Sequence, residues 1–393
     1  MVCVVLPLPP DLAWPVHLVC TWSNRIAPMA SIVEKRLTDG SKAYLVRYRT
    51  IDGSQRSKQF KRKREADAYV SLVEVDRMSG ALIDPRLGRI TIGEWWDQWW
   101  PTVTNLRPST RARDAQFYKT HIAPVFGDTP LAKLDRTSVR TWVARLGAPS
   151  GSRLAPATIH KVVQVLNKCV NAAVEDRLVQ SNPVAKLPLP KIERSEMRFL
   201  TSDEVWKVAD AIDPRYRALV LVGGFCGLRL GEMLGLRWAR VDLNGQRINV
   251  NETLVDIEAT IHFGPPKTKA SVRSVPVPSF VCDELRSILL KDCKPSDLVF
   301  RSPEGHAARP SQVRARFWEP AVQASGLAPL RIHDLRHTAV SLWIANGAHP
   351  KQVAALAGHT SVSVVLDRYG HLYPQHDLDL RMAMETHRRP TSS

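Results

Sequence analysis

Apolar and polar residues alternate in three short stretches near the N-terminus, which is the pattern of half-buried β-strands. The dipeptides Asp39-Gly40 and Asp52-Gly53 separate these stretches, and both favour tight hairpin turns. The pattern therefore predicts strands over residues 31–37, 43–50 and 55–62, followed by a helix over 64–78 whose apolar residues recur at helical spacing.

A helical pattern runs from residue 91 to about 185, where apolar residues recur every three or four positions. Four tryptophans between residues 95 and 100 share one side of the first helix, which favours a place in the core over base stacking. Ser109 can cap the second helix, and Asp135 or Thr137 can cap a helix over 138–146. A longer amphipathic helix is predicted over 156–175.

A polar stretch from 182 to 198 contains Pro183, Pro188 and Pro190, which cannot continue a helix, so we place a domain boundary there. The last module begins with helices, passes through strands near 247–255 and 272–277, and returns to helices. The fold class expected is multidomain α+β, with a small three-stranded sheet plus helix, a helical domain and a mixed, mainly α domain. The expected boundaries are 29–88, 89–185, a linker at 186–197, and 198–393 with a C-terminal tail.

Residues 1–28 are fairly apolar, but Pro7, Pro9, Pro10 and Pro15 interrupt them, and they lack the basic start of a signal peptide. No apolar run in the chain reaches the roughly 18 residues that would cross a bilayer. Because a strand pattern begins just after Met29, we expect residues 1–28 to be disordered or an artefact of start-codon choice.

The net charge of this 393-residue chain is +17, although 44% apolar and 24% charged residues are ordinary for a folded protein. So much positive charge indicates a polyanionic partner, most commonly nucleic acid. The six cysteines are scattered without a Cys-x-x-Cys pair, which favours reduced thiols of an intracellular protein over disulfides or a zinc site.

Basic side chains gather in the N-terminal module, where they alternate with tyrosine and phenylalanine along the strands. A sheet laid against DNA explains them, and an ordinary solvated charged face explains them equally well. The helical module adds further arginines. The DNA-binding residues expected are Arg47, Arg49, Lys58, Lys61, Arg62, Arg111, Arg113 and Lys269.

Arg229 follows a nearly all-apolar run over 218–226, so it emerges from the end of a buried helix. A buried arginine needs an anion, and Glu232, three residues later, can hold its guanidinium group. An internal ion pair with no further role is the alternative interpretation.

Lys267 and Lys269 lie in residues 266–271, which we interpret as a hairpin tip before the strand at 272–277. A lysine at such a tip can reach a phosphate or protonate a leaving oxygen. A solvated turn without a role is the alternative.

His333, Arg336 and His337 lie on one face of a helix, because three- and four-residue spacings bring side chains together. The two histidines also have the spacing of zinc-binding helices. However, Asp334 stands where a metalloprotease has its glutamate base, and Arg336 would bring positive charge beside the metal. We therefore expect no metal and no cofactor.

The three segments together, with His359 and Tyr369 downstream, suit metal-free phosphodiester transfer. Arginine forks match the two non-bridging phosphate oxygens and stabilise the charge of the transition state. A tyrosine hydroxyl can act as a covalent nucleophile, and a lysine can protonate the departing sugar oxygen.

The ordered motifs GLRLGEMLGLRW, PPKTKASVRSVPVP, RIHDLRHTAV and LAGHTSVSVVLDRYGHLYP closely resemble those of the tyrosine recombinase (phage integrase) family. The likeness covers about residues 31–375, and the last two motifs resemble integrases of actinobacterial phages and prophages most. It implies the tyrosine recombinase fold, with an arm-type DNA-binding domain, a SAM-like core-binding domain and a catalytic domain in that order.

The resemblance also implies a role for each matching residue. Arg229 and Arg336 would bind the scissile phosphate, and Glu232 would support Arg229. His333 would act as a general acid/base near the nucleophile, and His359 would donate a hydrogen bond to the phosphate. Lys267, or alternatively Lys269, would protonate the leaving 5′-hydroxyl. Tyr369 would form the 3′-phosphotyrosyl bond, and Tyr373 is the less favoured nucleophile.

The implied function is a site-specific recombinase that integrates or excises a phage or mobile element. The expected partner is double-stranded DNA at attachment sites, bound by a homotetramer that is monomeric when free, with a host DNA-bending protein and a directionality factor. The expected location is the bacterial cytoplasm at the nucleoid. The alternatives are a type IB topoisomerase-like enzyme, which the basic N-terminal module disfavours, and a catalytically silent DNA-binding regulator, which the complete catalytic set disfavours.

Overall fold

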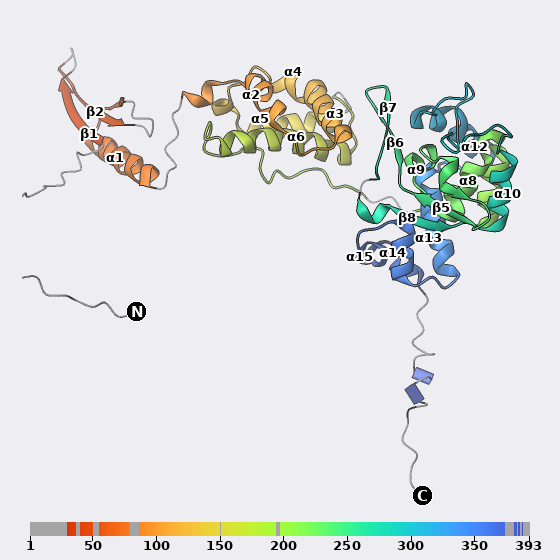
Figure 1. Ribbon diagram of the computed structural model, residues 1–393. Coiled ribbons are helices and arrows are strands. Elements are labelled where there is room, and N and C mark those ends of the chain that lie inside the picture. Colours follow the sequence, from red (N-terminus) through yellow and green to blue (C-terminus); the bar gives the residue numbers. More distant parts are fainter. Residues whose placement is uncertain are drawn as a thin grey trace, which may run out of the picture. The chain divides into compact units, whose positions relative to one another are not determined.

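The computed structural model describes residues 30–36, 40–49, 55–78, 86–149, 151–193, 197–266, 268–373, 381–382, 384–385 and 387 (Figure 1). Contacts divide the chain into two compact units, one formed by 1–104 with 117–190 and the other by 105–116 with 191–393. The expectation for residues 1–28 falls outside the described residues.

The N-terminal module is the predicted three-stranded sheet followed by a helix. Strands β1 (Ala30–Arg36), β2 (Lys42–Arg49) and β3 (Gln55–Phe60) pair antiparallel in the order β1-β2-β3, and α1 spans Lys63–Met78. Because side chains alternate along β2, Val46 and Tyr48 point to the same face of the sheet and pack with Ala66 of α1 in a small core. The opposite face of the sheet, the open face, carries no helix among the described residues of this module.

Short helices around a tryptophan-rich core form the helical module, as predicted. Trp95 and Trp96 are buried, and the indole Nε1 of Trp95 donates to the carbonyl oxygen of Cys169 at 2.9 Å. Asp135 caps α5 by accepting from two backbone amides, which confirms one predicted cap. The other is wrong: Ser109 lies inside α3, because the helix already begins at Pro108. The helices are α2 (Ile92–Trp99), α3 (Pro108–Phe117), a π-helical turn (Tyr118–Ile122), α4 (Ala123–Phe126), α5 (Arg136–Gly147) and α6 (Pro156–Glu175).

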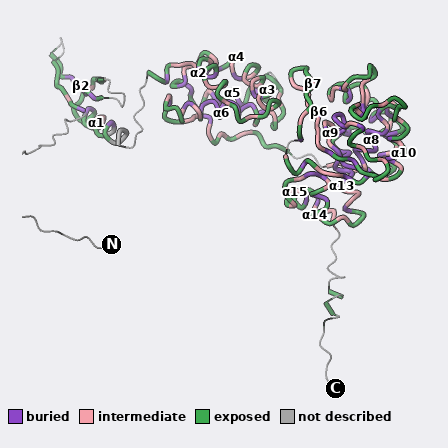
Figure 2. The backbone as a smooth tube through the Cα atoms, viewed as in Figure 1, coloured by how far each residue is buried: buried purple, intermediate pink, exposed green. Residues whose placement is uncertain are grey.

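Helices surround a buried central helix in the second unit. Helix α8 (Pro214–Cys226) packs against α7, α10 and α13, and Figure 2 shows how the buried residues concentrate along it. The other helices are α7 (Ser202–Ala211), α9 (Leu230–Leu234), α10 (Ser279–Ser287), α11 (Pro310–Gln312), a π-helical turn (Val313–Trp318), α12 (Glu319–Ala324), α13 (Ile332–Ala345), α14 (Pro350–Ala357) and α15 (Ser363–Tyr369).

The strands of this unit form two small sheets, and one of them corrects the sequence interpretation. Residues 266–271 are not a hairpin tip. The hairpin is formed by β6 (Thr253–Ile257) and β7 (Thr260–Gly264), and its turn is at Glu258 and Ala259, which both have positive φ. Neither residue is a glycine or asparagine, so the sequence carried no turn signal there. The lysine segment instead connects two sheets, one of β6 and β7, the other of β4 (Val241–Asp242), β5 (Arg247–Val250) and β8 (Arg273–Pro276).

A left-handed glycine ends α8 and sets the direction of the chain toward the predicted site. Gly227 has a φ of +68°, and a Cβ at this position would lie 2.8 Å from the ring of Trp343. Both facts favour glycine here, because it is the residue that adopts this conformation without a steric penalty. The turn delivers Arg229 at the start of α9.

Candidate functional site

Arg229 and Glu232 form the predicted ion pair at the start of α9. The Arg229 backbone amide donates to Glu232 Oε2 at 2.9 Å, and its Nη1 donates to Oε1 at 2.8 Å. The Glu232 side chain is only 3% exposed, whereas that of Arg229 remains 36% exposed. Glu232 therefore holds the Nη1 side of the guanidinium group and leaves part of the group accessible to a ligand.

Arg273 on β8 is a second partner of Glu232, and sequence reasoning missed it. Its two terminal nitrogens donate to the Glu232 carboxylate at 2.9 and 3.1 Å, and its side chain is 5% exposed. Its remaining capacity is used by the carbonyl oxygens of Leu356 at 2.6 Å and Ser271 at 3.0 Å. The signal was present in the sequence, because alternation along the strand puts Arg273 on the face of the buried Val275.

Glu232 stays ionised in this setting. Burial is the largest influence and favours the protonated acid, but the hydrogen bonds and charges of Arg273 and Arg229 outweigh it and lower the pKa of Glu232. The carboxylate therefore acts as a shared counterion for two arginines.

Arg336 on α13 is a third guanidinium group of this cluster, and it is 3% exposed. It donates to the carbonyl oxygen of Gly227 at 2.7 Å and to that of Ala357. Burial, followed by the charges of Arg229 and Arg273, lowers the pKa of Arg336 to about 9. Among the described residues, two of the three guanidinium groups share the Glu232 carboxylate and the third donates to carbonyl oxygens, so the cluster has surplus positive charge that suits the binding of an external anion.

His359 lies beside this cluster, directly after the left-handed Gly358 that ends α14. Its Nδ1 is buried and has no hydrogen-bond partner among the described residues. Burial, then Arg336 and Arg229, lowers the pKa of His359 to about 4, so the imidazole is neutral at pH 7. Arg229, Glu232 and His359 line the same cleft, so an anion bound there would meet the accessible part of the Arg229 guanidinium group.

Tyr369 ends α15 next to the cluster, and its hydroxyl lies 2.5 Å from Nδ1 of His337. The tyrosine is 1% exposed. Burial raises its pKa, while the charges of Arg336 and Arg368 oppose that rise. The residue that contacts the hydroxyl is His337. His333, which was expected near the nucleophile, is exposed, and its ring lies 4.9 Å from that of His337.

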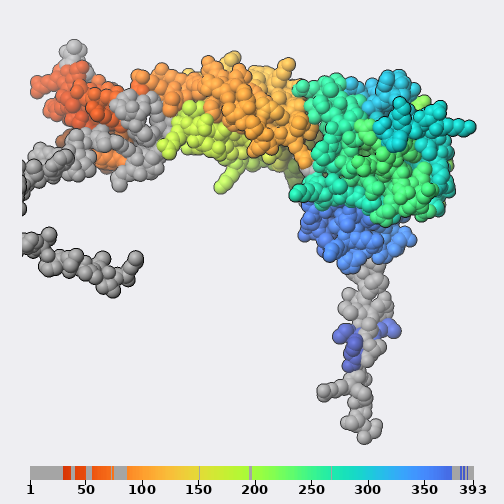
Figure 3. Space-filling model, viewed as in Figure 1, coloured from red at the N-terminus to blue at the C-terminus, as the bar shows by residue number. Residues whose placement is uncertain are grey.

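Among the described residues, no contact with the arginine cluster is seen for Lys269 or for the second tyrosine, Tyr373. Lys267 falls outside the described residues. Lys269 is exposed in a 3₁₀ turn (Lys269–Ser271) of the second unit, most of whose surface Figure 3 draws in green to blue. The hydroxyl of Tyr373 is buried without a hydrogen-bond partner among the described residues.

The predicted DNA-binding residues do not all share one surface. Arg47 and Arg49 are exposed on the open face of the N-terminal sheet. Lys58 pairs with Val46 in the strand register, so it belongs to the face that carries α1, and its ammonium lies 4.5 Å from the centre of the Tyr69 ring. Elsewhere, Lys61 and Arg62 are exposed before α1, Arg111 is half-buried in α3, and Arg113 pairs with the buried Asp114.

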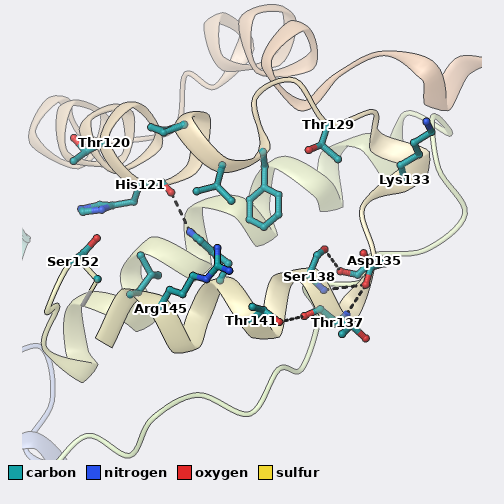
Figure 4. Close-up of a pocket in the computed structure, with 16 residues that line it drawn as sticks. Thr120, His121, Thr129, Lys133, Asp135, Thr137, Ser138, Thr141, Arg145 and Ser152 are labelled. Atoms are coloured by element: carbon teal, nitrogen blue, oxygen red, sulfur yellow. Dashed lines mark hydrogen bonds between the residues drawn. The ribbon is translucent and has the colours of Figure 1, made fainter. Parts of the chain in front are cut away.

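One hollow of the first unit is lined by none of the predicted catalytic or DNA-binding residues. It has a volume of about 820 Å³ and is lined by Thr120, His121, Asp135 and Arg145 among others (Figure 4). Several of the polar groups drawn there bond to one another: the Asp135 carboxylate caps α5, and the His121 carbonyl accepts from Trp142. No buried side-chain atom that lacks a partner among the described residues belongs to this hollow.

The residues that the structure describes carry neither a metal-binding cluster nor a membrane-spanning helix. Among them, no group of three or more His, Cys, Asp or Glu side chains is arranged to hold a metal ion. Within the same part of the chain, no helix combines the length and apolar character needed to cross a membrane.

Known proteins resemble this chain over most of its length. The profile described as Phage integrase family matches residues 198–376, and the one described as Phage integrase, N-terminal SAM-like domain matches 91–147. The chain is similar to the prophage phiRv2 integrase of Mycobacterium tuberculosis, with 28% identity over 338 residues that cover 82% of this chain and 86% of the relative.

Solved structures share the fold. A structure of the Tn1549 transposon integrase in complex with a circular intermediate DNA gives a TM-score of 0.61 at 17% identity, covering 76% of this chain and 100% of that one. A lambda integrase tetramer bound to a Holliday junction gives 0.53 at 18% identity, covering 89% and 96%.

The substitution Arg273→Lys tests the shared carboxylate. Lysine keeps the charge but cannot reproduce the bidentate fork or reach both carbonyl oxygens, so we expect the free energy of unfolding to fall by about 2–4 kcal/mol in urea titrations. The matched control is Arg286→Lys, whose partner Asp283 is exposed. It should change the free energy of unfolding by less than about 0.5 kcal/mol. Equal effects of the two substitutions would contradict the central place of Arg273.

Proposed function

Since this chain belongs to the phage integrase family of tyrosine recombinases and is a site-specific DNA recombinase, we propose that it cuts and rejoins DNA with Tyr369 as its nucleophile. The observation that carries the proposal is the arginine cluster beside this tyrosine. Among the described residues, the hydrogen-bond partners of Arg336 are two carbonyl oxygens, and its charge acts on the pKa of Tyr369. A scissile phosphate between them would supply the missing negative charge.

In the first step, the Tyr369 oxygen attacks the phosphorus atom and forms a 3′-phosphotyrosyl bond while the bond to the 5′-oxygen breaks. Arg229 and Arg336 bind the non-bridging oxygens, and the charge that develops on them is stabilised by this preorganised pair. His359 offers its unpartnered Nδ1 to the same phosphate. Glu232 holds Arg229 in place.

Proton transfer completes the step. Lys267 donates a proton to the departing 5′-oxygen, with Lys269 as the alternative donor from the same connection. His333 serves as an acid–base group near the nucleophile. In the reverse step, a 5′-hydroxyl of the exchanged strand gives its proton back to the lysine and attacks the phosphotyrosine. The bond between phosphorus and the Tyr369 oxygen breaks, and the tyrosine regains its proton. The reaction conserves the energy of the phosphodiester bond, so no cofactor is needed.

The domains divide the binding of DNA. Residues 29–88 form the arm-type DNA-binding domain, 89–185 the core-binding domain, 186–197 the linker, and 198–393 the catalytic domain with its C-terminal tail, while 1–28 lie outside them. Attachment-site DNA is the partner. The solved lambda integrase tetramer on a Holliday junction supports a homotetramer on DNA. The free protein is a monomer, and a host DNA-bending protein and a directionality factor assist it.

The similarity to a prophage integrase supports an origin in a phage or prophage. The protein then works on DNA in the cytoplasm of the bacterial host, at the nucleoid, where it integrates or excises the element.

Replacement of the nucleophile is the direct test of this function. On a nicked attachment-site duplex, with the sequence taken from the junctions of the integrated element, Tyr369→Phe should reduce the covalent protein–DNA adduct by more than about 10³-fold, because the phenol oxygen is gone. Tyr373→Phe is the matched control and should keep the adduct, which is measured as a slower band in denaturing gels. An adduct that persists in Tyr369→Phe would refute the assignment.

The open face of the N-terminal sheet generates a second expectation. A variant with both Arg47→Ala and Arg49→Ala should bind nonspecific duplex DNA more weakly. The plot of the logarithm of the binding constant against the logarithm of the salt concentration should become less steep by about 2, since two phosphate contacts are lost. Lys58→Ala should change the slope by less than about 0.5, because Lys58 lies on the face that carries α1. A larger loss for Lys58→Ala than for the double variant would place DNA on the other face.

A further inference from the structure

The hydroxyl of Tyr369 has a specific partner that the proposed mechanism does not yet use. It lies 2.5 Å from Nδ1 of His337, and both side chains are buried, at 1% and 6% exposure. The His333 ring lies one helical turn away, at 4.9 Å between ring centres from that of His337, and His333 is exposed. His337 is therefore the imidazole that is in contact with the reacting atom.

The direction of this hydrogen bond follows from its surroundings. Burial, and after it the charges of His333, Arg368 and Arg331, lower the pKa of His337 to about 4, while Asp334 opposes them. The imidazole is neutral at pH 7, and the phenol, whose pKa is raised by burial, keeps its proton. The Tyr369 hydroxyl therefore donates and Nδ1 accepts, which leaves the second ring nitrogen, Nε2, protonated.

We propose that His337 is the base that receives the proton of Tyr369 as the tyrosine attacks DNA. The inference rests on the proposed function and adds one group to it. The O–H bond of Tyr369 breaks, its proton moves to Nδ1, and the oxygen forms its bond to phosphorus. The bond to the 5′-oxygen then breaks, and that oxygen takes a proton from the lysine. In the reverse step the imidazolium returns its proton to the departing phenolate.

Binding of DNA makes the imidazole of His337 a stronger base. A phosphodiester beside Arg336 adds negative charge near the imidazole, which raises the pKa of His337, and the pentavalent transition state adds more. Arg336 and Arg368 already favour the phenolate form of Tyr369. The buried contact lets the proton move without water, and positioned bases of this kind contribute about 10²–10⁴-fold to a rate.

The test uses the full chain and single-turnover formation of the covalent adduct. His337→Asn places an amide near the position of Nδ1, so it keeps a hydrogen bond to Tyr369 but cannot take a proton. We expect adduct formation to slow by about 10²-fold or more and to become steeply faster with rising pH, because the phenol must then ionise by itself. His306→Asn, an exposed histidine in a loop, is the matched control and should react at the wild-type rate.

A substrate with sulfur in place of the bridging 5′-oxygen separates the base from the acid. A thiolate leaves without taking up a proton. This substrate should therefore restore the rate of adduct formation in Lys267→Ala but not in His337→Asn. Restoration of His337→Asn would mean that His337 serves the leaving group, which would overturn the inference.

Two other outcomes would also overturn it. A His337→Asn variant as fast as the wild type, or faster, would make the contact a restraint on the resting tyrosine. A slow variant with the pH profile of the wild type would make it a structural contact. Failure of the proposed function would look different, because the wild-type protein itself would then give no adduct that depends on Tyr369.

Discussion

The buried carboxylate of Glu232 is the constraint around which the second unit is arranged. Arg229 and Arg273 bind it from α9 and β8, and Arg273 also reaches the carbonyl oxygen of Leu356 near the end of α14. Removal of one partner from a buried pair leaves a charge without compensation, so these segments are held together by electrostatics as well as by packing. The same cluster contains Arg336, and its surplus of positive charge is what makes it suited to a phosphate.

This arrangement explains why chemistry gathers where several segments end. Arg229 follows the left-handed turn at Gly227, His359 follows the one at Gly358, and Tyr369 is the last residue of α15. Each reactive side chain is thus fixed by a helix terminus and placed beside the arginines. The resting nucleophile is buried and protonated, and the positive charges of Arg336 and Arg368 favour its ionised form against the effect of burial.

The sequence predicted those parts of the molecule that depend on local patterns. Alternation and helical spacing predicted the N-terminal sheet, α1 and α6, and the three-residue spacing of Arg229 and Glu232 predicted their pair. It did not predict contacts between distant segments. Arg273 and Glu232 are 41 residues apart, and His337 and Tyr369 are 32 apart, so only the folded chain brings them together. The turn at Glu258 and Ala259 was missed because its residues are not typical of hairpins.

The central claim is that the hydroxyl of Tyr369 becomes covalently joined to DNA. Its most direct measurement is tandem mass spectrometry of the adduct after digestion with nuclease and protease, which locates the residue that retains a nucleotide. Our account expects the nucleotide on Tyr369. If the protease cleaves after the exposed Arg368, the modified peptide begins at Tyr369; if it does not, the peptide also contains Asp367 and Arg368. A nucleotide on Tyr373, or on any residue other than Tyr369, would contradict it.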